Sequence, residues 1–169
     1  MKTLTKFFAI AVMLFISASS FAQVSATANV SGTIVTPIAI SKTTDMNFGN
    51  VAVSSTAGTV ILSTAGSRTK TGGVTLPTTT GTVAEAVFHI TGTPTYTYSI
   101  SLSGTPVTVT SSGNTMTVDN FITNPTPTGT LDGTGAQDIH IGATLNVAGN
   151  QAAGSYTSGT PFTVTVNYN

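Results

Sequence analysis

The sequence of 169 residues contains no cysteine. This absence excludes disulfides, thiolate metal sites, cysteine nucleophiles and the lipid-anchored cysteine of a bacterial lipoprotein. A domain without such cross-links must be held together by the packing of its core and by backbone hydrogen bonds.

Charged side chains are also scarce, at 6% of the chain, with five basic and five acidic residues. Two of the basic residues, Lys2 and Lys6, precede residue 23, so the remainder has three basic and five acidic residues and a net charge of −2. Nucleic acids, anionic membranes and highly charged substrates are recognised by concentrated charge, and we expect none of them as a partner. Low surface charge also removes a common defence against self-association, which we therefore expect.

The first 22 residues have the pattern of a secretory signal peptide. Lys2 and Lys6 form a positive start, residues 7–16 an apolar run, and residues 20–22 a cleavage site of the small-x-small kind. That run of ten residues is too short to span a bilayer, and no later stretch is long enough. We predict cleavage after residue 22, no membrane span in the mature chain, and export to the periplasm, the cell surface or the medium.

Helical periodicity is absent after residue 22, and apolar and polar residues alternate instead. Turn residues separate about ten stretches in which apolar and polar residues alternate, and this spacing is typical of a β-sandwich or barrel. They are residues 26–34, 38–40, 46–53, 59–63, 74–76, 84–91, 95–102, 106–110, 115–121, 137–147 and 162–169. We predict an all-β fold, an immunoglobulin-like antiparallel sandwich of about eight to ten strands, as one domain over residues 23–169.

The alternation also predicts which side chains form the core. Four stretches are the clearest: Ala84, Ala86, Phe88 and Ile90; Tyr96, Tyr98, Ile100 and Leu102; Ile139, Ile141, Ala143, Leu145 and Val147; and Phe162, Val164, Val166 and Tyr168. The last set is too apolar to lie unpaired at a sheet edge, and residues 26–34, of this chain or of another copy, are the leading candidate to cover it. Hairpin turns are predicted at Gly72–Gly73 and at residues 111–114, and the longest irregular segment at 124–137.

Two histidines are the best candidates for chemistry, and both have outward positions. Glu85 precedes His89 on the same face, and Asp138 precedes His140. If the two strands are neighbours, these four side chains could meet at a metal or acid–base site. The spacing matches no recognised ligand motif, and no G-x-S-x-G motif occurs, so we favour two exposed histidines. We expect no catalytic residue, no metal, no cofactor and no enzymatic activity.

Several blocks of the chain resemble the bacterial exported family called domain of unknown function 4402. They are ATANVSGTIVTPIAISKTTDMNFGNVAV, GSRTKTGGVTL, NTMTVDNF and IGATLNVAGNQAAGSYTSGTPFTVTVNYN. The blocks keep their order over nearly the whole chain after residue 22. The resemblance implies an extracytoplasmic β domain of uncharacterised function.

A second set of features resembles pilin subunits of the chaperone–usher type and spore-coat U-like proteins. These features are NFG at 47–49, AGSY at 153–156 and an alternating final strand with an aromatic residue, Tyr168, one place from its end. The resemblance implies a pilin-like sandwich that lacks one strand, which the N-terminal extension of a neighbour supplies. It implies a donor strand with Ala28, Val30, Gly32 and Ile34, and a strand held by a periplasmic chaperone with Val164, Val166 and Tyr168. Those pilins usually carry a disulfide that this chain lacks.

Two non-enzymatic roles follow from these features. The first is an exported structural or adhesion protein, a pilin-like subunit of a surface fibre or coat that assembles by strand addition. The second is a monomeric extracellular module that binds a glycan or a protein through residues 64–73 and 124–136. Arg68 and Lys70 lie in the first of these segments, where we favour solvated turn residues.

Overall fold

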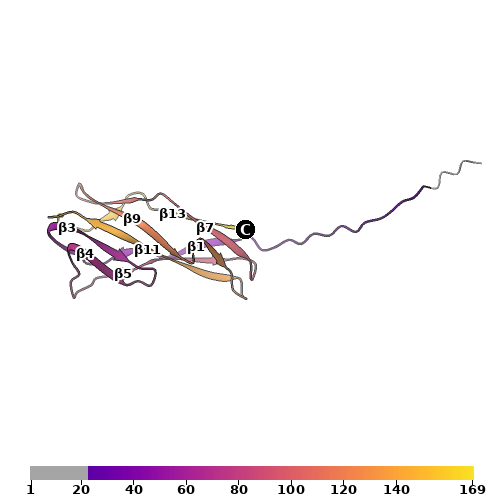
Figure 1. Cartoon of the computed structure of the whole chain (residues 1–169), viewed down its shortest axis with the longest axis horizontal. Coiled ribbons are helices and arrows are strands. Elements are labelled where there is room, and N and C mark those ends of the chain that lie inside the picture. The colour runs from indigo at the N-terminus through magenta and orange to yellow at the C-terminus, as the bar shows by residue number, and fades with distance from the viewer. Residues whose placement is uncertain (1–22) are drawn as a thin grey trace, which may run out of the picture. The chain divides into compact units, whose positions relative to one another are not determined.

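The computed structural model describes residues 23–169, which contain strands and no helix (Figure 1). The all-β prediction is therefore confirmed, whereas the predicted signal peptide lies outside the described residues. Residues 35–169 form one compact unit, and residues 23–34 precede it. The strands are β1 (Ala39–Thr44), β2 (Asn47–Phe48), β3 (Ala52–Leu62), β4 (Arg68–Thr75), β5 (Val83–Ala84), β6 (Ala86–Thr91), β7 (Thr97–Ser103), β8 (Val107–Ser111), β9 (Asn114–Asn124), β10 (Thr128–Thr130), β11 (Ala136–Val147), β12 (Thr157–Ser158) and β13 (Thr163–Tyr168).

Most strands belong to two antiparallel sheets that enclose the core. The large sheet has eight strands in the order β1-β6-β11-β9-β8-β12, with β3 between β11 and β4. Its central strand β11 pairs with β6 through its first half and with β3 through its second half, and with β9 on its other edge. The small sheet has the order β10-β7-β13, and β2 pairs with β5. The edges of the two main sheets decide where another strand can be added.

The predicted core positions are confirmed with two exceptions, Ala84 and Tyr96. Ala84 is half-buried in β5 and belongs to neither buried cluster. One buried cluster joins the large sheet to the small one. It contains Ala86, Ile90, Tyr98, Leu131, Ile139, Ile141, Val164 and Val166. Val60, Val74, Val107, Val118, Ala143, Leu145 and Val147 form a second buried cluster. Tyr96 lies before the start of β7 and is exposed, because alternation places a side chain only within a strand.

The predicted turn at Gly72–Gly73 is wrong, because both glycines lie inside β4. Gly72 is paired with Gly58 of β3 at an irregular part of the ladder. A Cβ atom on Gly73 would collide with the carbonyl oxygen of Thr56, so the glycine permits a close backbone approach. The turn lies earlier, where the N–H of Ser63 donates to the carbonyl of Ser67 at 2.9 Å.

Two other connections bear on the predicted loops. The predicted turn at residues 111–114 is confirmed, since Ser111 pairs with Asn114 and the two residues between them have positive φ, 47° at Ser112 and 84° at Gly113. Residues 124–137 are less irregular than predicted, because they contain β10, which pairs with β7.

The predicted strand over residues 26–34 is also wrong. Residues 23–34 form neither strand nor helix and are exposed at every position. A β-strand needs a neighbour to receive its backbone hydrogen bonds. Alternation predicts only that a segment can bury one face against a sheet. Among residues 23–169, no strand is paired with residues 26–34.

Replacement of Ile139 by alanine tests the core. Ile139 is 0% exposed in the cluster between the two sheets, so Ile139→Ala should lower the free energy of unfolding by about 2–5 kcal/mol. Ile61→Ala is the matched control, because Ile61 is 39% exposed and should lose about 1 kcal/mol or less. Urea unfolding measures both values. Equal losses in the two variants would contradict the assigned core.

Candidate functional site

Among residues 23–169, the terminal strand β13 is paired on one edge only. It pairs with β7 along its whole length, from Thr163 opposite Ser103 to Tyr168 opposite Tyr98, and it ends the order of the small sheet. The N–H of Asn169 donates to the carbonyl of Thr97 at 3.2 Å. The backbone N–H and C=O groups of the odd-numbered residues of β13 therefore point towards β7. Because backbone groups alternate between the two edges of an antiparallel strand, those of Val164, Val166 and Tyr168 point to the unpaired edge.

The inward face of β13 is apolar, as the sequence predicts. Val164 and Val166 are buried between the sheets. Phe162 packs against Phe121, with ring centroids 4.9 Å apart, and against Phe88 at 6.2 Å. These contacts fix β13 against the core while its second edge remains unpaired, the arrangement that invites a further strand.

Tyr168 ties the end of β13 to the start of the compact unit. Its hydroxyl donates to the carbonyl of Thr36 at 2.9 Å and accepts from the N–H of Thr93 at 2.7 Å. The hydroxyl of Thr93 donates to the same carbonyl at 3.2 Å. The ring of Tyr168 packs edge-on against the ring of Tyr96. The compact unit therefore begins beside the Tyr168 end of β13. Spacing in the sequence gave no signal for Thr36 or Thr93, because the three residues come from distant parts of the chain.

The first strand, β1, is a second unpaired edge beside the same core. Within the part of the chain that the structure describes, β1 pairs with β6 alone. Ile38, just before β1, packs on the cluster that contains Val164 and Val166. Ile40 and its partner Ile90 share a face, yet Ile90 is 0% exposed and Ile40 is 37% exposed. Ile40 is therefore partly exposed at the edge of the sheet, whereas Ile90 is covered. We call the unpaired edges of β1 and β13 together the open edge.

Residues 23–34, which we call the extension, carry the complementary pattern. The even positions are small or apolar (Ala26, Ala28, Val30, Gly32 and Ile34), and the odd positions are polar (Thr27, Asn29, Ser31 and Thr33). Val30 is 96% exposed and Ile34 is 100% exposed. Exposed apolar residues at alternate positions are typical of a strand that buries one face against a sheet.

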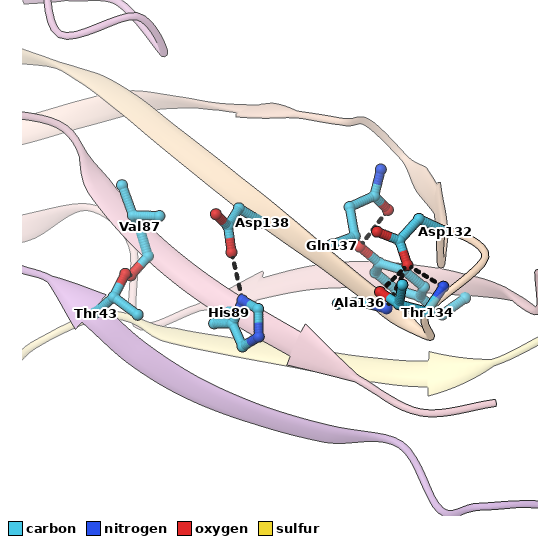
Figure 2. A network of polar contacts seen from close by, with 9 residues as sticks. Thr43, Val87, His89, Asp132, Thr134, Ala136, Gln137 and Asp138 are labelled. Carbon is cyan, nitrogen blue, oxygen red and sulfur yellow. Dashed lines mark hydrogen bonds and ion pairs between the residues drawn. The ribbon is translucent and has the colours of Figure 1, made fainter. Parts of the chain in front are cut away.

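The two histidines form two separate hydrogen-bonded pairs with carboxylates. Strands β6 and β11 are neighbours, as the hypothesis of a polar site requires. Nδ1 of His89 lies 2.6 Å from a carboxylate oxygen of Asp138 directly opposite (Figure 2), whereas Nδ1 of His140 lies 3.2 Å from Glu85. Residues 23–169 contain no group of three or more histidine or carboxylate side chains placed to hold a metal ion. Partly exposed pairs of this kind stabilise a fold by about 1 kcal/mol or less.

In the two segments predicted as binding loops, charged side chains form hydrogen bonds with backbone groups of the same chain. Arg68, in β4, donates to the carbonyls of Phe48 and Asn50, and Lys70 donates to the carbonyl of Val74 at 2.9 Å. A carboxylate oxygen of Asp132 accepts from the N–H of Ala136 at 3.0 Å and from that of Thr134 at 2.8 Å (Figure 2). These bonds, with one from the Thr134 hydroxyl, lower the pKa of Asp132.

The remaining polar groups near β10 are structural. The Tyr98 hydroxyl donates to Gln137 at 2.7 Å, and the same Gln137 oxygen accepts from the N–H of Thr130 at 2.9 Å. Burial, and secondarily the charge of Asp138, raises the pKa of Tyr98 to about 12.

A hollow of about 250 Å³ between β7 and β9 is lined by Ile100, Leu102, Phe121, Ile122, Thr123 and Thr126, with no charged side chain. No helix in residues 23–169 is long and apolar enough to cross a membrane.

The Tyr168 contacts can be tested with a variant that removes one hydroxyl. Tyr168→Phe leaves the N–H of Thr93 without its acceptor and should lower the free energy of unfolding by about 1–2 kcal/mol. We expect faster hydrogen exchange at the Thr93 amide. Tyr96→Phe is the control, because its ring packs on the same tyrosine and no described hydrogen bond involves its hydroxyl. An equally slow Thr93 amide in both variants would contradict these contacts.

Comparison with known protein families identifies a matching family model. The family model described as Domain of unknown function (DUF4402) matches residues 38–168, from just before β1 to the last residue of β13. No curated protein and no solved structure matches the chain. The resemblance to pilin and spore-coat subunits therefore stays a prediction. Because the family model covers most of the sequence, the chain belongs to the DUF4402 family.

Proposed function

We propose that this protein is a non-enzymatic, exported structural or adhesion subunit that assembles by strand addition. The extension of one copy pairs with the open edge of another, and the repeated contact builds a fibre or coat. The observation that carries the proposal is the combination of an apolar strand, β13, unpaired on one edge, with an exposed alternating segment in the same chain. Recognition of an extended segment by a sheet edge is a general mode of protein association.

Burial of the apolar positions supplies the driving force. Val30 and Ile34 are almost fully exposed, and burial of each side chain stabilises by about 1.5–3 kcal/mol. The unpaired backbone groups of Val164, Val166 and Tyr168 gain partners at the same time. Both terms favour pairing over exposure, and the low charge of the chain adds little repulsion between copies.

Export supports this role and is part of the proposal. Residues 1–22 have the signal-peptide pattern, so the mature chain begins at Gln23, at the start of the extension. The pilin resemblance adds a periplasmic chaperone that would hold Val164, Val166 and Tyr168 before assembly. The alternative role, a monomeric binding module, has less support, because residues 68–73 lie in β4 and their cations are bound to backbone carbonyls.

Light scattering after size exclusion tests assembly with matched variants. The chain from Gln23 should form oligomers whose size grows with concentration and incubation time. Val30→Asp combined with Ile34→Asp should remain monomeric, because a carboxylate cannot be buried in the open edge without a partner. The control, Asn29→Asp with Thr33→Asp, adds the same charge at outward positions and should still assemble.

Two outcomes of this experiment would overturn the proposal. One is an intact chain that stays monomeric at high concentration while a variant lacking residues 23–34 is unfolded, since the extension would then belong to its own domain. The other is equal assembly of both aspartate variants, which would place the contact elsewhere on the molecule.

A further inference from the structure

We infer that the protein binds uncharged glycans at the end of the small sheet where Tyr96 and Asp132 lie. The ring of Tyr96 stacks on the apolar face of a sugar, and the carboxylate of Asp132 accepts hydrogen bonds from hydroxyls of the same sugar or of the next one. The inference rests on the adhesion role within the proposed function, and it adds a site and a class of ligand.

Tyr96 supplies an exposed aromatic ring that is already held in place. It is 43% exposed, whereas the other aromatic side chains of residues 23–169 are buried or half-buried. Its ring packs edge-on against Tyr168, with ring centroids 5.4 Å apart. The Tyr168 hydroxyl is in turn hydrogen-bonded to Thr36 and Thr93. A ring that is fixed before binding loses little conformational entropy when a ligand stacks on it.

A strained residue immediately precedes Tyr96 in the chain. Thr95 has a φ of 64°, a conformation that is rare for a β-branched side chain. Its N–H donates to the carbonyl of Leu131 at 3.1 Å and to that of Asp132 at 3.2 Å, and these bonds hold the strained backbone. Strained residues that the surrounding structure holds in place are typical of ligand sites. The strain at Thr95 therefore directs attention to the exposed ring beside it.

Asp132 lies close to Tyr96 because two connections of the chain are hydrogen-bonded to each other. The N–H of Leu131 donates to the carbonyl of Tyr96 at 3.0 Å, and Asp132 is one position further along. The N–H of Gly92 donates to the carbonyl of Gly135 at 2.9 Å, which joins the same two connections at a second point. Diagonal neighbours on paired strands lie within about 8 Å of each other, so one or two sugar rings reach from Tyr96 to Asp132.

The carboxylate of Asp132 is oriented by the chain and has one oxygen left for a ligand. Its Oδ1 atom accepts from the N–H groups of Thr134 and Ala136 and from the Thr134 hydroxyl (Figure 2). Among residues 23–169, Oδ2 has no hydrogen-bond partner within the printed bonds of this side chain. The bonds to Oδ1 lower the pKa of Asp132, so the carboxylate is ionised at neutral pH. An ionised carboxylate only accepts hydrogen bonds, and its bonds with hydroxyl groups are strong.

The surroundings of the two side chains favour an uncharged ligand that is rich in hydroxyl groups. Residues 92–97 and 130–136 include no cation, so Asp132 would repel an acidic sugar without compensation. A purely apolar ligand would leave the carboxylate without a partner. A neutral sugar offers an apolar ring face to the aromatic ring and hydroxyls to the carboxylate. Further hydroxyls stand nearby in the sequence of the two connections, on Thr93, Thr95, Thr97, Thr130 and Thr134.

Saturation-transfer NMR with neutral tetrasaccharides tests the inference, because it detects sugar binding to monomeric and assembled protein alike. The chain from Gln23 is mixed in turn with cellotetraose, chitotetraose, mannotetraose and laminaritetraose. We expect at least one of them to bind with a Kd of about 1 mM, since a small exposed site supplies only modest affinity. The acidic trisaccharide sialyllactose should bind about tenfold more weakly than that tetrasaccharide.

Four variants locate the site. Tyr96→Ala should weaken binding about tenfold, and Tyr96→Phe, which keeps the ring, should recover most of it. Asp132→Asn keeps an oxygen for the bonds to Thr134 and Ala136 but removes the charge, so it should weaken binding about threefold to tenfold. Ile61→Ala on β3 is the matched control, because Ile61 has a similar exposure of 39% and should leave binding unchanged. Urea unfolding of each variant shows that it is folded.

Three results would overturn the inference. They are no binding of any of the four tetrasaccharides at about 10 mM, ten times the expected Kd, binding that Tyr96→Ala leaves unchanged, and tighter binding of sialyllactose. A chain that assembles in the light-scattering experiment but binds no sugar would refute the glycan site and leave strand addition standing. A chain that binds sugar through Tyr96 but stays monomeric would refute assembly and leave the glycan site standing.

Discussion

The unpaired edge of β13 is the constraint on which the rest of the structure depends. A strand at a sheet edge exposes backbone groups that can pair with another chain, and proteins usually protect such edges with charge, proline or a short strand. Here the strand is bounded by Phe162 and Tyr168, has buried valines between them and carries no charge. The neighbouring edge at β1 leaves Ile40 uncovered. The compact unit is thus a sandwich with an unpaired apolar strand, β13, at one edge of its small sheet.

The composition follows from that arrangement. Without cysteine, stability comes from the two buried clusters and from long antiparallel ladders, of which those of β11 with β6, β3 and β9 are central. Threonine and serine keep the outer faces wetted without charge, and β-branched threonine also favours the extended backbone. A charge-free face next to an unpaired strand does not repel another copy. Low charge and an open edge together leave out two features by which proteins usually avoid association.

Much of the fold could be predicted from alternation. The inward residues of β11, from Ile139 to Val147, and those of β13 were all predicted. In a half-buried strand every second side chain faces the core, so the apolar residues alternate with polar ones. The turn between β8 and β9 was predicted from Ser112 and Gly113, whose positive φ has a local cause. These features depend only on neighbouring residues.

Features that depend on distant residues could not be predicted. Gly72 and Gly73 resemble turn residues, but they serve a close approach to β3 that only long-range pairing creates. The partners of His89 and His140 were set by the register of β6 against β11. Residues 26–34 alternate like a strand, yet sequence alone does not state whether the sheet that pairs with them belongs to the same molecule.

Hydrogen exchange along β13 tests the central claim most directly, in a chain that lacks residues 23–34 and with a peptide of residues 23–35 added. If the edge is free, the amides of Val164 and Val166 exchange rapidly without the peptide, while those of Thr165 and Asn167, directed at β7, are already slow. Peptide binding should then slow Val164 and Val166 at least tenfold and leave the odd positions unchanged. Slow exchange at Val164 and Val166 without the peptide, or no change when it is added, would contradict an unpaired edge that accepts the extension.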